Sequence, residues 1–180
     1  PVATTGLSGS TNEDQSVVIS LTGSDIDGDN LTFSLDSDAL NGSVALDGAL
    51  ATYAPNSNFN GDDSFSFTVS DGEYSSSADV SVSIAAVNDA PVLAAVSDVS
   101  FDEDGSGQVS LSGSDVDGDD LTYSITGGSD ITATLDGGSD VTFSVPQDYN
   151  GSESFSVSVT DDEYTDSQII TVTVNAVNDA

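Results

Sequence analysis

The sequence is one unit of 90 residues written twice, and this repetition constrains the fold more than any other feature. Residues 1–90 and 91–180 align without a net gap, and 35 of the 90 aligned positions are identical. Both halves open with Pro-Val and close with Val-Asn-Asp-Ala. The middle parts, near 36–58 and 126–148, are shifted by one residue, as expected for small insertions in loops. The sequence therefore predicts two domains, 1–90 and 91–180.

Each repeat alternates apolar and hydroxyl-bearing residues with the period of a β-strand. The longest runs lie at 64–70 and 80–84, with counterparts at 154–160 and 170–174. Alternation of this kind places one set of side chains, such as Phe65, on a single buried face. Shorter runs of the same type occupy 31–35, 108–112, 121–125 and 141–145. About seven short strands per repeat, without a helical period, predict an all-β chain of two small two-sheet sandwiches.

The charge of the chain is entirely negative. There are 32 Asp and Glu residues and no Lys, Arg, His or Cys. Nucleophile pairs such as Ser–His and zinc sites with His or thiolate ligands are therefore excluded. With no basic side chains to neutralise phosphates, nucleic acids and anionic membrane surfaces are also excluded as partners.

Two further features concern order and location. Leu, Ile, Val and Phe make up 45 of the 180 residues, a share typical of folded chains rather than of disordered acidic tails. No run of 18 apolar residues and no signal peptide is visible, so we expect no membrane insertion. A surface protein without either segment is expected to be a fragment of a longer secreted protein.

The acidic residues gather in three clusters per repeat, and all of them lie in expected loops. The first cluster is an Asp-x-Asp-Gly-Asp motif, formed by Asp25, Asp27 and Asp29 in one repeat and by Asp115, Asp117 and Asp119 in the other. The second is a Glu-Asp pair that begins at Glu13 or Glu103. The third flanks a strand and comprises Asp62, Asp63, Asp71 and Glu73, with Glu153, Asp161 and Glu163 as counterparts.

These clusters favour a hard divalent cation. Two unit charges 4 Å apart repel by about 4 kcal/mol at an effective dielectric near 20, so neighbouring acidic loops would be driven apart. A site made only of oxygen ligands is typical of Ca²⁺. A single Asp in a loop is as often a turn or cap residue, but the repeated motif is more specific, because its Gly turn lets two carboxylates converge. It is not an EF-hand, since the sixth position is Asn30 or Asp120 instead of Gly.

Together the motifs resemble a known family. The Glu-Asp pair, the stretches DIDGDNLTFS and DVDGDDLTYS, the NG–SF–V–D stretch and the junction VNDAPV are similar to the cadherin-like, immunoglobulin-fold tandem repeats of large bacterial surface adhesins, including those of the RTX type. The resemblance covers both repeats. It implies two immunoglobulin-like (cadherin-like) β-sandwich domains in an extended rod, outside the cell or on the bacterial surface. It also implies a monomer, with calcium ions between successive domains as cofactors and the neighbouring repeats as partners.

Carried over to this sequence, the resemblance implies calcium ligands from both repeats and from the link. For the complete junction these are Glu13, Asp62 or Asp63, Asn88, Asp89, Asp115, Asp117, Asp119 or Asp120, and Asp161. Half-sites at the two ends would use Asp25, Asp27, Asp71, Glu103, Glu153, Asn178 and Asp179. The link departs from the pattern of animal cadherins, because Ala86 stands where their first Asp is expected. The implied function is that of a calcium-stiffened spacer in cell adhesion or biofilm formation, without enzymatic activity.

Two other functions remain open on sequence alone. The chain could bind a cell-surface glycan or another surface ligand through aromatic residues near loops, namely Phe59, Tyr74, Tyr149 and Tyr164. Phe59 and Tyr149 precede Asn-Gly turns in both repeats, which favours a role in closing the ends of the sandwiches. A glycosidase that uses two carboxylates is also chemically conceivable, but acids on loop tips do not predict a catalytic pocket.

Overall fold

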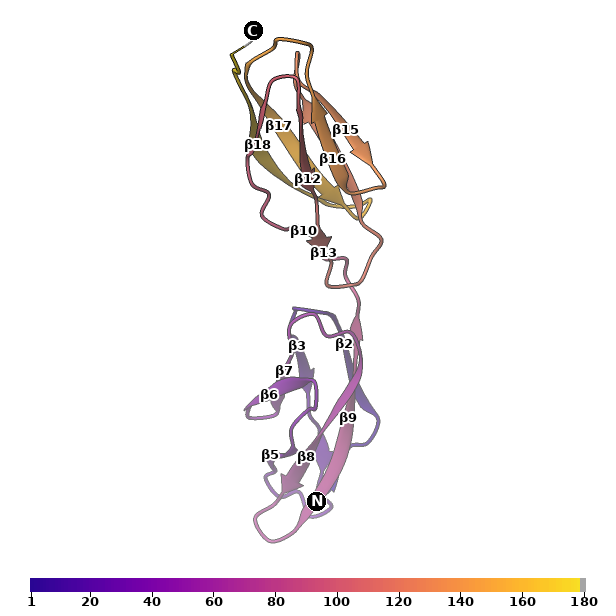
Figure 1. Cartoon of the computed structure of the whole chain (residues 1–180). Coiled ribbons are helices and arrows are strands. Elements are labelled where there is room, and N and C mark those ends of the chain that lie inside the picture. Colours follow the sequence, from indigo (N-terminus) through magenta and orange to yellow (C-terminus); the bar gives the residue numbers. More distant parts are fainter. Residues whose placement is uncertain (179–180) are drawn as a thin grey trace. The chain divides into compact units, whose positions relative to one another are not determined.

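The computed structural model describes residues 1–178 and divides the chain into two compact units, Pro1–Val87 and Asn88–Ala180. The boundary falls before Asn88, so the structure assigns Asn88 and Asp89 to the second unit. Every regular element in the described residues is a β-strand (Figure 1). The all-β prediction is therefore confirmed. Residues 1–178 contain no helical segment that could span a bilayer.

The first unit contains two main sheets and one short strand pair. Its strands are β1 (Val2–Ala3), β2 (Leu7–Asn12), β3 (Val17–Ser20), β4 (Gly23–Ser24), β5 (Thr32–Ser37), β6 (Gly42–Asp47), β7 (Leu50–Pro55), β8 (Gly61–Ser70) and β9 (Ser75–Ala85). One sheet has the order β2-β9-β8-β5 and the other β3-β7-β6, while β1 pairs with β4. Strand β2 runs parallel to β9, and the other pairings are antiparallel.

The second unit repeats this topology. Its strands are β10 (Val92–Leu93), β11 (Val99–Asp102), β12 (Ser106–Ser110), β13 (Gly113–Ser114), β14 (Thr122–Gly127), β15 (Thr132–Asp136), β16 (Asp140–Ser144), β17 (Gly151–Thr160) and β18 (Thr165–Asn175). The sheets have the orders β11-β18-β17-β14 and β12-β16-β15, and β10 pairs with β13. As in the first unit, the single parallel pairing joins β11 to β18. The run predicted at 108–112 begins and ends two residues earlier, as β12.

The alternating pattern buries one face of each sheet. In β8, Phe65, Phe67 and Val69 are almost fully buried, as the sequence predicts, and Ser64, just before them, is exposed; of the two intervening residues, Ser66 is buried and Thr68 is half-buried. Each unit has a core of its own, centred on Phe67 and Tyr53 in the first and on Phe143 and Phe155 in the second. Burial of such a side chain contributes about 1.5–3 kcal/mol. Each repeat thus buries its own core and leaves its acidic residues to the loops and the outer faces.

Candidate metal centre

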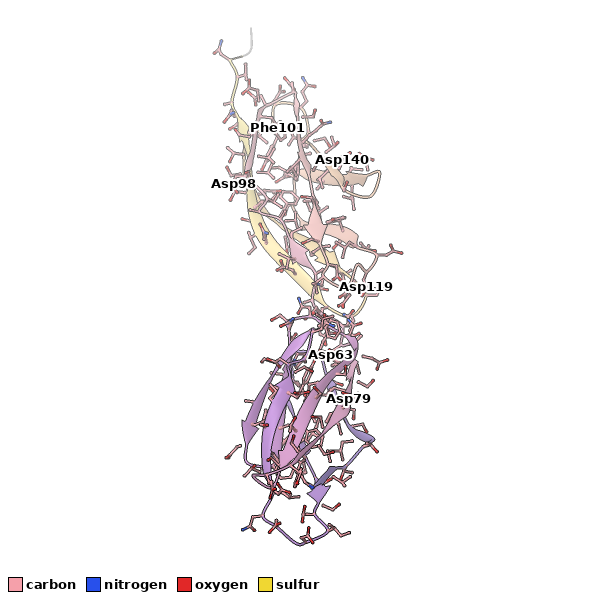
Figure 2. The ribbon with its side chains drawn as sticks, turned by 90° about the horizontal axis from the view of Figure 1, so that it is seen from below. Asp63, Asp79, Asp98, Phe101, Asp119 and Asp140 are labelled. Carbon is pink, nitrogen blue, oxygen red and sulfur yellow. The ribbon has the colours of Figure 1, made fainter. Side chains whose placement is uncertain are left out.

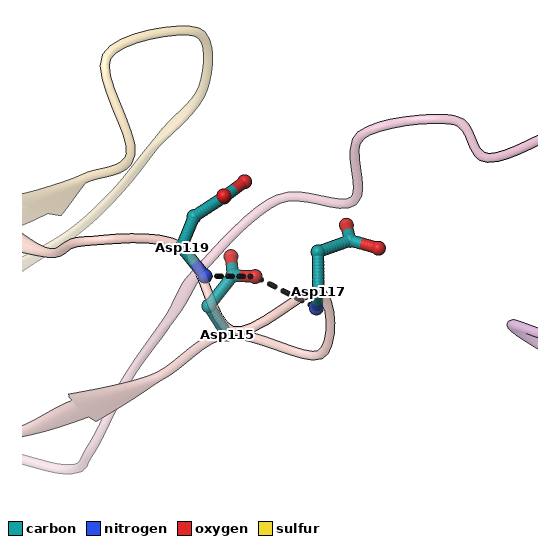
Figure 3. A group of neighbouring side chains, drawn as sticks. All are labelled: Asp115, Asp117 and Asp119. Carbon is teal, nitrogen blue, oxygen red and sulfur yellow. Dashed lines mark hydrogen bonds between the residues drawn. The ribbon is translucent and has the colours of Figure 1, made fainter.

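The Asp-x-Asp-Gly-Asp loop of the second unit connects β13 to β14 and folds around one carboxylate. Oδ1 of Asp115 accepts hydrogen bonds from the backbone N–H groups of Asp117 (2.8 Å), Gly118 (3.1 Å) and Asp119 (3.4 Å), and Figure 3 shows two of them. Gly118 has a φ of 81°, which a residue with a side chain rarely adopts. The loop thereby brings carboxylate oxygens of Asp115, Asp117 and Asp119 within 4.8 Å of one another.

The second oxygen of Asp115 is the most informative atom of this cluster. Oδ2 is buried, and it has no hydrogen-bond partner among the described residues. A buried acceptor without a partner is costly and calls for a physical explanation. Nearby, partial loss of solvent raises the pKa of Asp119, and the carboxylates of Asp115, Asp117 and Asp161 raise it further. The cluster therefore holds more negative charge than its protein surroundings neutralise.

Residues of the link join this cluster within the second unit. The side-chain amide of Asn88 donates to Oδ2 of Asp161 over 2.9 Å, and the backbone N–H of Asp89 donates to Oδ2 of Asp117 over 2.8 Å. Asp161 follows β17, and its Oδ1 accepts the N–H groups of Glu163 and Tyr164. The Tyr164 N–H is the main cause that lowers the pKa of Asp161, so this carboxylate is ionised at neutral pH.

The first unit contains the same loop, folded around Asp25. Oδ1 of Asp25 accepts the N–H groups of Asp27, Gly28 and Asp29 in the same pattern. Its Oδ2 lies 3.0 Å from the amino group of Pro1, which is also 3.8 Å from Oδ2 of Asp71. The Pro1 amino group is the main cause that lowers the pKa of Asp25.

The two glutamates of the second predicted cluster are buried, and each contacts the backbone just after the last strand of its own unit. Glu13 is only 4% exposed, and its Oε1 accepts the backbone N–H of Val87 over 2.5 Å. Its Oε2 is buried without a partner among the described residues. In the second unit, Oε1 of Glu103 accepts the N–H of Val177, but Oε2 accepts from the side-chain amide of Asn150 over 3.4 Å. The unpartnered oxygen is therefore specific to the first unit.

The structure gives Asp63 and Glu153 contacts inside their units. Asp63 accepts the N–H groups of Leu40 and Asn41 and the hydroxyl of Tyr53. Burial alone would raise the pKa of Asp63, but the N–H of Ser64, together with these three hydrogen bonds, outweighs burial and lowers it. Glu153 accepts three backbone N–H groups, from Ser129, Asp130 and Ile131. Asp62 is exposed on the solvent face of β8.

The remaining predicted residues divide as follows. Asp27, Asp71, Asp117 and Asp161 lie in the loops described above, whereas Asp179 lies outside the described residues. Of the aromatic candidates, Phe59 and Tyr149 contact the hydrophobic cores, as the prediction that they close the sandwiches requires. Tyr74 and Tyr164 are 65% and 43% exposed.

The donor set fits calcium. Carboxylate oxygens converge at the Asp115 loop, one of them is buried without a partner, and no cationic side chain exists in the chain to compensate them. Calcium takes six to eight oxygen ligands in flexible geometry, whereas Mg²⁺ demands near-ideal octahedral geometry and zinc prefers nitrogen and sulfur. Residues Asp115, Asp117, Asp119 and Asp161 could therefore hold calcium.

The fold and the paired acidic loops define a class of protein: tandem immunoglobulin-like β-sandwich repeats that carry acidic loops. A sequence profile described as a bacterial Ig domain matches residues 1–83 and matches again at residues 88–173. The chain therefore belongs to the bacterial Ig domain family. This finding confirms the predicted immunoglobulin-like fold class. No curated protein matches the chain.

Solved structures with a similar fold include cadherin ectodomains. Human protocadherin-24 EC1-2 is 18% identical, with a TM-score of 0.59, and the match covers 95% of this chain and 95% of that one. Drosophila N-cadherin EC1-4 is 13% identical, with a TM-score of 0.56, over 100% of this chain and 51% of that one. An endo-fucoidan hydrolase of glycoside hydrolase family 107 is 23% identical over 96% of this chain, at a TM-score of only 0.39. This chain spans 28% of the length of that hydrolase.

Proposed function

We propose that each repeat binds calcium through its Asp-x-Asp-Gly-Asp loop and that the chain is a calcium-dependent spacer in a large secreted or cell-surface adhesin. Domains of this family usually belong to extracellular surface proteins. The observation that carries the proposal is Oδ2 of Asp115, which is buried without a partner among the described residues. This oxygen lies in a loop that brings carboxylate oxygens of Asp115, Asp117 and Asp119 within 4.8 Å of one another, in a chain without any basic side chain.

In the second unit, several carboxylates would bind the ion together. Asp115, Asp117 and Asp119 supply carboxylate oxygens from one loop, and Asp161 adds another from the turn after β17. The three N–H groups that hold Oδ1 of Asp115 fix that carboxylate before any ion arrives, which lowers the ordering cost of binding. When bound, calcium would supply the positive charge that the chain itself lacks.

In this proposal, calcium binding restricts the motion of the link, because residues of the link contact the acidic cluster. Asn88 and Asp89 contact Asp161 and Asp117 of the second unit, while Val87, one residue earlier, donates to Glu13 of the first. An ion held by the Asp115 cluster would stabilise the contacts of the link, and the link would then lose freedom. We propose that repeats become stiffer in this way. Within the first unit, the buried Oε2 of Glu13, which has no partner among the described residues, would be a ligand of its own cation. Cell adhesion or biofilm formation would use the stiffened array, without enzymatic activity.

Calorimetric titration of the full chain with CaCl₂ tests this proposal. We expect binding with a Kd of about 0.1–1 mM, as in other extracellular modules. Asp115→Asn should weaken the affinity at least tenfold, because it removes one charge from the loop. Asp79→Asn is the matched control, since Asp79 is an exposed strand residue of β9 and belongs to neither Asp-x-Asp-Gly-Asp loop, and it should bind calcium as the wild type does. Absence of binding, or equal weakening by both substitutions, would refute the proposal.

A further inference from the structure

The first unit has a groove that the calcium proposal does not use. It measures about 1040 Å³ and lies on the solvent face of the β2-β9-β8-β5 sheet, near the start of β8. Its floor is formed by three adjacent strands, β2, β9 and β8, and its wall by the loop from Asp38 to Asn41. This loop lies beside β8 because β5 ends at Ser37, opposite Ser66.

The floor of the groove is a regular grid of polar side chains. In one row, Ser81 of β9 pairs with Ser8 of β2 and with Ser64 of β8. In the next row, Ser83 pairs with Ser10 and with Asp62. Strand spacing sets neighbours in a row about 4.8 Å apart, and the two rows are separated by about 6.7 Å along the strands.

All six residues of the grid are exposed. Within residues 1–178, no protein group forms a hydrogen bond with the hydroxyl of Ser8, Ser10, Ser64, Ser81 or Ser83. These hydroxyls are therefore available to a ligand, and each can both donate and accept.

The wall of the groove, the loop from Asp38 to Asn41, is fixed by hydrogen bonds to Asp63. Oδ1 and Oδ2 of Asp63 accept the N–H groups of Leu40 and Asn41 at 3.2 and 2.9 Å, and Oδ2 also accepts the hydroxyl of the buried Tyr53 at 2.9 Å. Asp63, labelled in Figure 2, therefore ties the loop to the core. Leu40 on this loop is 86% exposed and offers an apolar surface beside the serine grid. The groove is thus already formed without a ligand.

The second unit differs at the corresponding positions, although its sheet has the same topology. Thr171 and Thr173 replace Ser81 and Ser83, and Asp98 replaces Ser8. Their polar groups bond internally: Asp98 accepts the N–H of Thr171, and the hydroxyls of Ser152 and Thr173 lie 3.0 Å apart. Internal bonds thus engage the side chains of Asp98, Ser152 and Thr173, and Thr171 carries an extra methyl group, so this face offers fewer free hydroxyls than the grid of the first unit.

We propose that this groove binds a segment of an uncharged polysaccharide. Serine hydroxyls, which donate and accept, match a ligand whose own hydroxyls do the same, and the carboxylate of Asp62 accepts from sugar hydroxyls. Leu40 suits the C–H face of a sugar ring. Asp38, Asp62 and Asp79 make the face acidic and thereby exclude sulfated or uronic-acid chains. No aromatic residue lines the groove, so a single site binds weakly, in the millimolar range.

Amide NMR of the full chain in calcium-containing buffer tests this proposal independently of metal binding. The probes are hexasaccharides of maltose, cellulose, xylan, β-mannan and laminarin type, each titrated to 20 mM, with an alginate hexasaccharide and spermine as charged probes. We expect at least one neutral probe to shift the amide signals of residues 8–10, 38–41, 62–64 and 81–83. The alginate probe should shift none of them.

A double substitution, Ser81→Thr with Ser83→Thr, gives the groove the residues of the second unit. It keeps the hydroxyls and favours strand structure, so the variant should fold, and it should weaken binding at least tenfold. Thr171→Ser with Thr173→Ser changes the same methyl groups outside the groove and should leave binding unchanged. The proposal is overturned if no neutral probe binds, if the shifts centre on Tyr74 and Tyr164, if spermine alone binds, or if the groove variant binds as the wild type does.

Discussion

Aspartate carries out different tasks at neighbouring positions of this chain, and the hydrogen bonds show which task each residue has. Asp25 and Asp115 each organise a loop through one carboxylate oxygen, and the other oxygen of Asp115 is buried without a partner among the described residues. Asp63 ties a loop to the hydrophobic core. Asp162 occupies a left-handed backbone position, with a φ of 81°. A substitution of Asp therefore has a different expected effect at each of these sites.

The strained position of Asp162 leads to a prediction about stability. The equivalent residue of the first unit is Gly72, with a φ of 98°. Asp162→Gly should stabilise the second unit by about 1 kcal/mol, because a residue with a side chain loses about that much in the left-handed region. Chemical denaturation of both proteins measures the difference, with Asp79→Gly as a control that should destabilise a strand. A less stable Asp162→Gly protein would contradict this interpretation of the backbone.

Substitution of Asp119 should have opposite effects on thermal stability without and with calcium. Its pKa is raised by partial loss of solvent and by neighbouring carboxylates, so its charge is unfavourable in the metal-free protein. Asp119→Asn should therefore raise the melting temperature in EDTA and reduce the further increase that calcium produces. Melting curves of the variant and the wild type in both buffers measure the two effects. A variant that melts lower in EDTA would show that Asp119 has a stabilising role of its own.

Asp63 should make the first unit sensitive to acid. Its folded pKa is lowered from the ordinary value of 3.8, so the unfolded chain takes up the proton more readily. The stabilisation is thus complete above about pH 4 and is lost as the pH falls through the folded pKa. Asp63→Asn should lower stability at pH 7 and flatten its decline below pH 4, as followed by denaturation at several pH values. An unchanged pH profile would show that the lowered pKa does not contribute to stability.

At the scale of elements, the alternating pattern of apolar and polar residues predicts the strands. It does not predict how residues of facing strands pack against each other. The runs at 64–70 and 154–160 become parts of β8 and β17, because every second residue must be buried. The sequence does not reveal that a glycine and a valine on facing strands have opposite positions in the two units. Gly9 faces Val17 in the first unit, whereas Val99 faces Gly107 in the second.

This exchange predicts an energetic coupling between Val99 and Gly107. A Cβ atom on Gly107 would lie 2.7 Å from Cγ1 of Val99 and 2.6 Å from Cδ1 of Phe101. Gly107→Ala should therefore destabilise the second unit by about 1–3 kcal/mol through overpacking. Val99→Ala should cost less in the Gly107→Ala background than in the wild type, because it removes part of the clash. A double-mutant cycle measures the coupling, and strict additivity would contradict the contact.

In the candidate site, too, features formed by residues close in sequence could be predicted, whereas features formed by separate strands could not. The Asp-x-Asp-Gly-Asp motif could be recognised from sequence, because its carboxylates lie two residues apart around a Gly turn. The separate roles of Asp62 and Asp63 could not, since both are acidic and only the direction in which each leaves β8 distinguishes them. The serine grid was also missed. Its residues come from three strands, and their alignment depends on the register between β2, β9 and β8.

At the scale of the whole molecule, the dominant property is a net charge of −32 without any basic side chain. The two cores account for folding of each unit, but they do not compensate this charge. A divalent cation bound in the loops would do so where carboxylates are closest. At a tenfold excess over its Kd, each ion would stabilise the folded chain by about 1.4 kcal/mol. For a unit of this size that corresponds to an increase of about 5 °C or more in melting temperature.

Calorimetric melting of the full chain in CaCl₂, in MgCl₂ and in EDTA, at one ionic strength, tests the central claim most directly. The account predicts that calcium raises the melting temperature by about 5 °C or more above both other conditions, and that Asp115→Asn reduces this increase while Asp79→Asn does not. Equal melting temperatures in the three buffers would contradict it.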